Sequence, residues 1–295
     1  MNRRNFLALI AAAPFAVQLQ AQSLRRTRKK NTDTVATTKY IFAQAMRRAA
    51  KNNWHRKPIG ELMGDLAFLL QGTPYVGGTL EGEPEMCRID LTGLDCVTLF
   101  ESVLGMARIV KRKEYTFDAL INEITLTRYR QGILDGYPSR LHYTSDWIDD
   151  NVAKGVVQDI TRDLGGVIFP IKINFMSTHP QYYKPLKEDT AARAKIAEIE
   201  SEVNARMRYY IPKDRIETIE SMLATGDIIA ISTSKDGLDY SHTGLIFRDI
   251  DGNARFLHAS SQKKKVVLDV RVGEYVNSVK SNTGITVVRP LEPIS

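Results

Sequence analysis

Three residues of this chain, Cys96, His242 and His258, have the side chains that nucleophilic catalysis needs. Cys96 follows Asp95, and from Cys96 onward the apolar residues recur with the spacing of a helix. We therefore expect Asp95 to cap a helix that begins at Cys96. Free backbone N–H groups and the helix dipole at this position would stabilise a thiolate, although the charge of Asp95 would oppose them. A thiolate here would need a cationic partner.

Both histidines lie in strand-like runs near the C-terminus. His242 begins SHTGLIF and His258 lies in RFLHASS, and the turn Asp251-Gly252 separates the two runs. Neighbouring antiparallel strands can hold such side chains next to each other. One imidazole could then accept the thiol proton while the other orients it. Nucleophile, base and orienting residue follow this order along papain-type chains.

Other interpretations of the cysteines stay open. Cys96 could be a small buried hydrophobic residue at the start of its apolar stripe. In an exported chain, Cys87 and Cys96 could also form a disulfide. Five scattered histidines and two cysteines make no metal set, so we expect neither a metal nor another cofactor.

The net charge of +7 is concentrated at the N-terminus. Residues 1–30 contain seven basic residues and no acidic one, which leaves 34 Lys and Arg against 34 Asp and Glu in the rest of the chain. The body is therefore formally neutral, and we expect no nucleic-acid partner.

Residues 1–22 have the pattern of a secretory signal peptide, with a basic start and an apolar run from Phe6 to Val17. RRNFL also resembles a twin-arginine signal, so the export route stays open. The run is too short for a membrane anchor, and we expect a periplasmic or secreted protein without a membrane span. Residues 23–37 are polar and basic, which predicts a flexible linker.

The remainder, 38–295, is predicted to be a single α+β domain in which helices precede antiparallel strands. Helical patterns cover 38–53, 59–72, a segment from Cys96 with one buried face, and 116–129. Strand-like runs cover 226–233, 241–249, 254–261, 264–270 and 283–290. Residues from about 130 to 215 are less regular and are predicted to be an insertion that builds a substrate groove.

The segments GTPYVGG, LDCVTL, GDIIAI, SHTGLIF and FLHASS together resemble the motif series of NlpC-type cell-wall cysteine hydrolases. These papain-like enzymes cut amide bonds of bacterial peptidoglycan. The resemblance implies that Cys96 is the nucleophile, His242 the base and His258 the third member, with Tyr75 beside the nucleophile. It also implies a papain-like core whose nucleophile helix packs on a C-terminal antiparallel sheet.

After Asp-Cys this family commonly has Ser-Gly, whereas this chain has Val97-Thr98. That departure, with SRLHYTSDWI, FMSTHPQYY and RYYIPK, is similar to a narrower branch, the N-acetylmuramoyl-L-alanine amidase-like proteins, over about residues 40–290. The resemblance implies an amidase that acts on peptidoglycan or muropeptides, with the bond between N-acetylmuramic acid and L-alanine favoured. We also expect the protein to be a monomer.

Three alternatives remain. An endopeptidase would cut between D-glutamate and the diamino acid of the stem peptide. A non-catalytic cell-wall-binding protein would be expected to have lost at least one of the three catalytic residues. An acyltransferase acting on lipids would be expected to have an exposed apolar or membrane-anchoring segment, and the sequence shows none beyond the leader.

Substrate contacts are predicted for Tyr75, Asp95, His142, Trp147 and Ser177. An indole face suits a sugar ring, while His, Ser and Asp side chains suit hydroxyl groups and peptide backbone. The alternative is that Trp147 belongs to the core.

Overall fold

The computed structural model describes residues 13–294, and their side chains from residue 32 onward. The α-helices are Ala13–Lys51 (α1), Ile59–Leu69 (α2), Cys96–Lys111 (α3), Phe117–Arg128 (α4), Thr144–Ala153 (α5), Phe175–Thr178 (α6), Lys184–Glu188 (α7), Thr190–Asn204 (α8), Ile216–Ile219 (α9) and Val272–Ser278 (α10). The predicted helices at 59–72 and 116–129 are confirmed, and Thr116 caps the second through its hydroxyl.

The strands are Val157–Asp159 (β1), Val167–Ile168 (β2), Tyr209–Pro212 (β3), Ile228–Thr233 (β4), Tyr240–Arg248 (β5), Ala254–Ser260 (β6), Lys265–Arg271 (β7) and Asn282–Pro290 (β8). They form one sheet in the order β2-β3-β8-β4-β5-β6-β7, with β1 also paired to β8. The ladders between these strands are antiparallel, and the five predicted strand runs are confirmed as β4 to β8.

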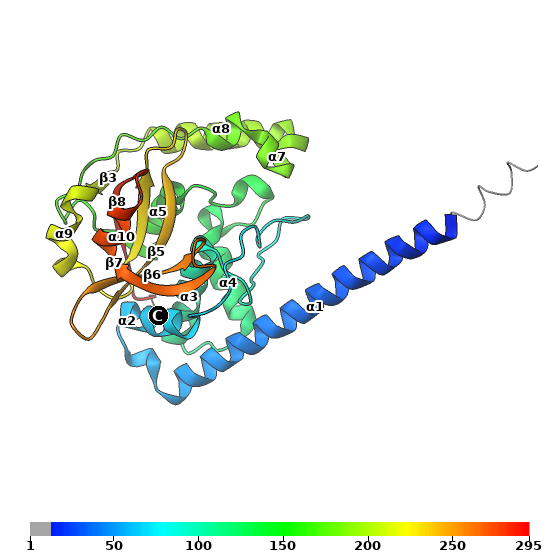
Figure 1. Cartoon of the computed structure of the whole chain (residues 1–295), viewed down its shortest axis with the longest axis horizontal. Coiled ribbons are helices and arrows are strands. Elements are labelled where there is room, and N and C mark those ends of the chain that lie inside the picture. The colour runs from blue at the N-terminus through cyan, green and yellow to red at the C-terminus, as the bar shows by residue number, and fades with distance from the viewer. Residues whose placement is uncertain (1–12, 295) are drawn as a thin grey trace, which may run out of the picture.

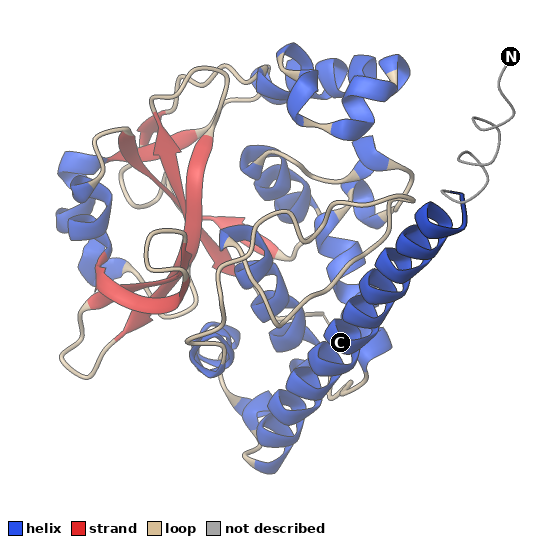
Figure 2. Ribbon diagram, turned by 45° about the vertical axis from the view of Figure 1, so that its right-hand side comes forward, coloured by secondary structure: helices blue, strands red, loops and turns tan. Residues whose placement is uncertain are grey.

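Helices cover both faces of this sheet (Figures 1 and 2). Successive residues of a strand point to opposite faces, so Ile228 packs in the cluster that contains α2 and α3, whereas Ile229 packs with α9 and α10. Apolar side chains are therefore needed on both faces. This explains why β4 is a continuous apolar run and not an alternating one.

Helix α3 lies at the centre of the larger cluster. Every residue from Thr98 to Val110 is buried, because α2, α4 and the sheet surround the helix. The prediction of one buried face was therefore wrong. The two charged side chains within this buried stretch are paired with those of α4: Glu101 Oε2 lies 2.8 Å from Arg128 Nε, and Arg108 bonds Glu123. Unpaired, such buried charges would strongly destabilise the fold.

The predicted linker at 23–37 is helical and forms part of α1. No glycine or proline interrupts the chain between Phe15 and Lys51, the last residue of α1, so no helix-breaking residue lies within the predicted linker. The C-terminal half of α1 packs on the body, and its first turns extend beyond it (Figures 1 and 2). Within residues 13–294, no helix is both long and apolar enough to cross a membrane. The predicted signal peptide begins outside the described residues.

The segment predicted as an insertion contributes to the same sheet. β1 and β3 both pair with β8, and β2 extends the sheet through β3. The remainder of the segment includes α6 to α8, which form a separate apolar cluster with Tyr137 and Tyr143. Periodicity alone missed β1 to β3, because they are only two to four residues long.

Candidate active site

Cys96 is the first residue of α3, and the predicted cap is confirmed. The Asp95 carboxylate accepts hydrogen bonds from the backbone N–H groups of Val97 and Thr98 at 3.1 and 2.8 Å, and the Thr98 hydroxyl accepts one from the Asp95 N–H at 2.9 Å. This capping box fixes the first turn of the helix and hence the position of the thiol. Both cysteines are free, and Cys87 Sγ lies 3.7 Å from the Ile121 carbonyl oxygen.

Strand β5 is joined directly to the start of α3. The Thr243 hydroxyl donates a hydrogen bond to the Cys96 carbonyl at 2.9 Å. The hydroxyl and the backbone N–H of Thr243 also lower the pKa of the Cys96 thiol through hydrogen bonds. The first residue of α3 is therefore bonded to the residue of β5 that directly follows His242.

The two predicted histidines are in contact. His242 Nε2 lies 2.7 Å from His258 Nδ1, and the imidazole planes are nearly perpendicular, at 87°. His258 is fully buried, and its Nε2 lies 3.3 Å from Asp269 Oδ2. Lys263 Nζ approaches the same oxygen at 2.7 Å. The structure thus extends the pair into a chain from His242 through His258 to Asp269.

Sequence reasoning missed Asp269, Lys263 and a third residue, Tyr275 of α10. The Tyr275 ring lies 6.0 Å from the His242 ring and 4.7 Å from the His258 ring, measured between centroids. An acidic residue within the apolar run KKVVLDV was the available signal for Asp269. Lys263 and Tyr275 had no comparable signal, because their place depends on how β7 and α10 pack.

The thiol and both imidazoles are uncharged at neutral pH. Burial, followed by the charge of Asp95, raises the pKa of Cys96 to about 11. Burial, followed by the charge of His258, lowers the pKa of His242 to about 3. Burial also lowers the pKa of His258 to about 4, against the opposing effect of Asp269. A neutral thiol beside a neutral imidazole suits proton transfer during attack, without a preformed ion pair.

Tyr75 pairs with Leu94, two residues before Cys96. Burial raises the pKa of the Tyr75 phenol, and the charges of Cys96 and Asp95 raise it further. Its loop is held on two sides, because the Tyr75 N–H donates to the Lys264 carbonyl at 2.9 Å and the Val76 N–H donates to the Leu94 carbonyl at 3.0 Å. The loop of Tyr75 is therefore held against the residues that lead into the first turn of α3.

The structure corrects the expectation for Trp147. Its side chain is only 2% exposed, and the indole packs edge-on against Phe100 of α3 with ring centroids 4.9 Å apart. A ring buried in this way has no free face for a sugar. The alternative interpretation as a core residue therefore holds.

His142 and Ser177 lie in the predicted insertion, and their polar atoms are engaged within the chain. His142 Nε2 lies 2.9 Å from the Tyr137 carbonyl oxygen, and burial, followed by the charge of a neighbouring arginine, lowers its pKa to about 3. The Ser177 hydroxyl donates to the Asn174 carbonyl at 3.3 Å, and its N–H donates to Glu200 at 3.1 Å. These contacts are all within the protein, so they account for both residues as structural ones.

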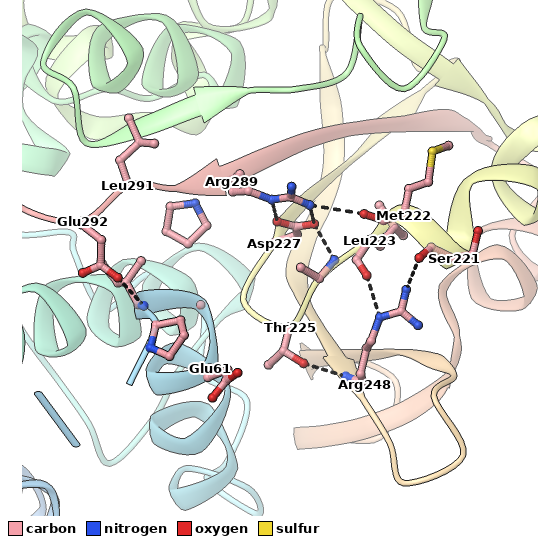
Figure 3. Close-up of a pocket in the computed structure, with 15 residues that line it drawn as sticks. Glu61, Ser221, Met222, Leu223, Thr225, Asp227, Arg248, Arg289, Leu291 and Glu292 are labelled. Carbon is pink, nitrogen blue, oxygen red and sulfur yellow. Dashed lines mark hydrogen bonds and ion pairs between the residues drawn. The ribbon is translucent and has the colours of Figure 1, made fainter. Parts of the chain in front are cut away.

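A cavity of about 900 Å³ lies at the other end of β5 from His242 (Figure 3). Its two guanidinium groups are already bonded: Arg289 donates to Asp227 twice at 2.8 Å, and Arg248 donates to the Leu223 carbonyl at 2.7 Å. The cavity includes none of the predicted site residues. Nowhere in residues 13–294 do three His, Cys, Asp or Glu side chains form a group that could hold a metal ion.

An antiparallel sheet with helices on both faces, and a polar centre where α3 meets β5 and β6, define a mixed α/β protein. Its motifs point to hydrolytic chemistry at that centre. The chain belongs to the AmiA-like family of N-acetylmuramoyl-L-alanine amidase-like proteins, whose family model matches residues 65–285.

Solved structures agree with this assignment. A crystal structure of an N-acetylmuramoyl-L-alanine amidase from Bacteroides uniformis is 35% identical to the chain, with a TM-score of 0.75, and the match covers 79% of this chain and 99% of that one. A Bacteroides fragilis protein described as a candidate xylanase is 36% identical, with a TM-score of 0.71 and coverage of 76% and 98%. No curated protein sequence matches the chain.

Proposed function

We propose that this protein is an exported, cysteine-dependent amidase that hydrolyses an amide bond of peptidoglycan, most favourably the bond between N-acetylmuramic acid and L-alanine. The family assignment and the B. uniformis structure support the peptidoglycan amide as substrate class. The observation that supports the cysteine chemistry is the hydrogen bond of 2.9 Å that joins the Cys96 carbonyl to Thr243, the residue directly after His242.

In the proposed mechanism, His242 accepts the thiol proton as the sulfur attacks the amide carbonyl carbon. The developing oxyanion is held by the backbone N–H of Cys96 and a nearby donor. His242 then gives the proton to the departing amine, the C–N bond breaks and a thioester remains. Water, deprotonated by His242, cleaves the thioester and restores the thiol.

The motif series around Tyr75, Cys96, His242 and His258 further supports an NlpC-type, papain-like description of this centre. The replacement of Ser-Gly by Val97-Thr98 does not disturb it, because Thr98 completes the capping box.

The name given to the B. fragilis relative raises glycoside hydrolysis as another possibility. Such enzymes commonly need a pair of carboxyl groups on either side of the scissile bond. Near the imidazole pair, the Asp95 carboxylate caps a helix and Asp269 bonds His258 and Lys263. Neither is placed as a free acid or nucleophile, so the geometry favours amide hydrolysis.

Digestion of muropeptides followed by mass spectrometry tests the proposal. We expect free stem peptide beginning at L-alanine, and loss of roughly 10²-fold or more of the rate in Cys96→Ala and His242→Ala. Cys87→Ala is the matched control, because that thiol lies away from the imidazoles, and it should stay active. Cleavage after D-glutamate would indicate the endopeptidase instead, and an active Cys96→Ala would overturn cysteine catalysis.

Iodoacetamide labelling separates a catalytic thiol from a structural one. Because the pKa of Cys96 is about 11, its alkylation at neutral pH depends on His242 accepting the thiol proton. Cys96 should therefore react at neutral pH in the wild type and lose this reactivity in His242→Ala, whereas the alkylation rate of Cys87 should be the same in both proteins. N-terminal sequencing of the protein recovered from the periplasm tests export. A mature chain beginning near residue 23 is expected, and an uncleaved chain confined to the cytoplasm would contradict it.

A further inference from the structure

The carboxylate of Asp269 is held in one orientation. Its Oδ1 accepts a hydrogen bond from the backbone N–H of Val270 at 2.9 Å. Its Oδ2 faces both the Lys263 ammonium at 2.7 Å and the His258 Nε2 at 3.3 Å. The side chain is mostly buried on β7. Each oxygen therefore has a fixed partner, and only Oδ2 faces the imidazole.

Those contacts decide where the protons of the two imidazoles lie. An ionised carboxylate only accepts hydrogen bonds, so His258 must carry its proton on Nε2. A neutral His258 then has an unprotonated Nδ1, which can only accept. The bond of 2.7 Å to His242 therefore requires the proton of His242 to be on Nε2. The lone pair of His242 is left on Nδ1, the ring nitrogen that does not face His258.

We propose that Asp269 is a positioning residue that sets the tautomers of both histidines and so keeps the free nitrogen of His242 ready to accept the thiol proton. The catalytic consequence rests on the proposed function, whereas the proton positions do not. Asp269 touches neither the substrate nor the thiol in this scheme, and it acts through His258.

The charge states of the chain fit this role. Burial alone would raise the pKa of Asp269, but hydrogen bonds from Lys263, Val270 and His258 hold it below its ordinary value. The carboxylate is thus ionised over the neutral range, while His242 and His258 are both neutral there. An acceptor-only group at one end and two neutral rings leave a single consistent arrangement of protons.

Asp269→Asn should reverse that arrangement. The Val270 N–H must still be paired, which keeps the amide oxygen of the new residue at the Oδ1 position. The amide nitrogen then takes the place of Oδ2 and donates to His258 Nε2. His258 is forced to carry its proton on Nδ1, and His242 on its own Nδ1. The nitrogen that should accept the thiol proton then carries a hydrogen.

The test is ¹⁵N NMR of the imidazole side chains in the full-length protein, which distinguishes protonated from unprotonated ring nitrogens. In the wild type we expect Nε2 protonation in His242 and His258, and in Asp269→Asn protonation on Nδ1 in both. Lys263→Met removes the cation but keeps the carboxylate, so it should keep the wild-type tautomers. Unchanged tautomers in Asp269→Asn, in a protein whose spectrum shows that it is folded, would overturn the proposal.

Activity separates this proposal from the proposed function. The muropeptide rate should fall roughly 10²- to 10⁴-fold in Asp269→Asn, the size expected when a general base is disabled. Asp251→Asn makes the same chemical change in the exposed β5–β6 turn and should keep the wild-type rate. A wild type that hydrolyses no muropeptide but shows the expected tautomers would refute the function alone. An active wild type with Nδ1-protonated histidines would refute the role of Asp269 alone.

Discussion

At the scale of single residues, Asp95 acts on Cys96 in two opposing ways. Its carboxylate caps α3 and so fixes the turn that carries the thiol. Burial is the largest cause of the raised pKa of the thiol, which is about 11, and the charge of Asp95 is the second largest. The same side chain thus positions the sulfur and keeps it protonated until a base removes the proton. A polar but uncharged cap would keep the first effect and lose the second.

Asp95→Ser and Asp95→Ala separate the two effects. Serine caps helices nearly as well as aspartate, so thermal unfolding of Asp95→Ser should resemble the wild type, whereas Asp95→Ala should lose about 1 kcal/mol. Both variants lack the charge, so the pH midpoint of Cys96 alkylation should move to lower values in both. An unchanged midpoint would show that Asp95 does not control the thiol.

At the scale of elements, the histidine pair depends on the close approach of β5 and β6. The two strands pair from Arg248 opposite Ala254 to Leu245 opposite Leu257. Gly244 is the next residue of β5, and a Cβ there would lie 2.5 Å from the Phe256 ring and 2.9 Å from His258 Cβ. Only glycine leaves space for the His258 side chain to stand beside His242.

Gly244→Ala should therefore move His258 away from its partner. We expect a loss of about 1–3 kcal/mol, because the Phe256 ring cannot yield without disturbing the core. Differential scanning calorimetry measures the stability, and the imidazole NMR signals report the pair. Gly77→Ala is the control, since nothing lies within 4 Å of a Cβ there. A stable Gly244→Ala with an intact pair would contradict this explanation.

At the scale of the whole molecule, burial of titratable groups links stability to pH. His142, His242 and His258 have pKa values lowered to about 3, 3 and 4 from 6.5. In the window between those values and 6.5, the unfolded chain binds protons that the folded chain does not. The stability that these neutral rings confer is complete above pH 6.5 and is lost as the pH falls through the window. Burial raises the pKa of Asp239, which acts in the opposite direction.

His142→Gln isolates one of these groups outside the candidate active site. Glutamine can still donate to the Tyr137 carbonyl but cannot bind the proton. The free energy of unfolding of this variant should therefore depend less steeply on pH between about 6.5 and 4, by up to about 1.4 kcal/mol per pH unit. Urea titrations across this range measure the slope. Equal slopes in variant and wild type would show that His142 titrates normally in the fold.

The sequence was sufficient for features that one segment encodes by itself. Caps such as Asp95 and Thr116 mark helix starts because the capping groups lie within three residues of each other. Strands β4 to β8 are long apolar runs between turns, and the Asp251-Gly252 turn placed the strands of His242 and His258 side by side. Local hydrogen bonding and periodicity carry this information, so no knowledge of the fold was needed.

The tertiary structure decided what depends on the packing of distant segments. Trp147 is a core residue because α3 covers it, and residues 23–37 are helical as part of α1. Asp269 reaches His258 only through the register of β6 and β7, which an irregularity shifts between Arg255 and Leu257. Such a shift changes which side chains face each other and leaves no trace in the periodicity of either strand. The proton positions of the candidate site follow from that register, because a hydrogen bond depends on where both partners lie.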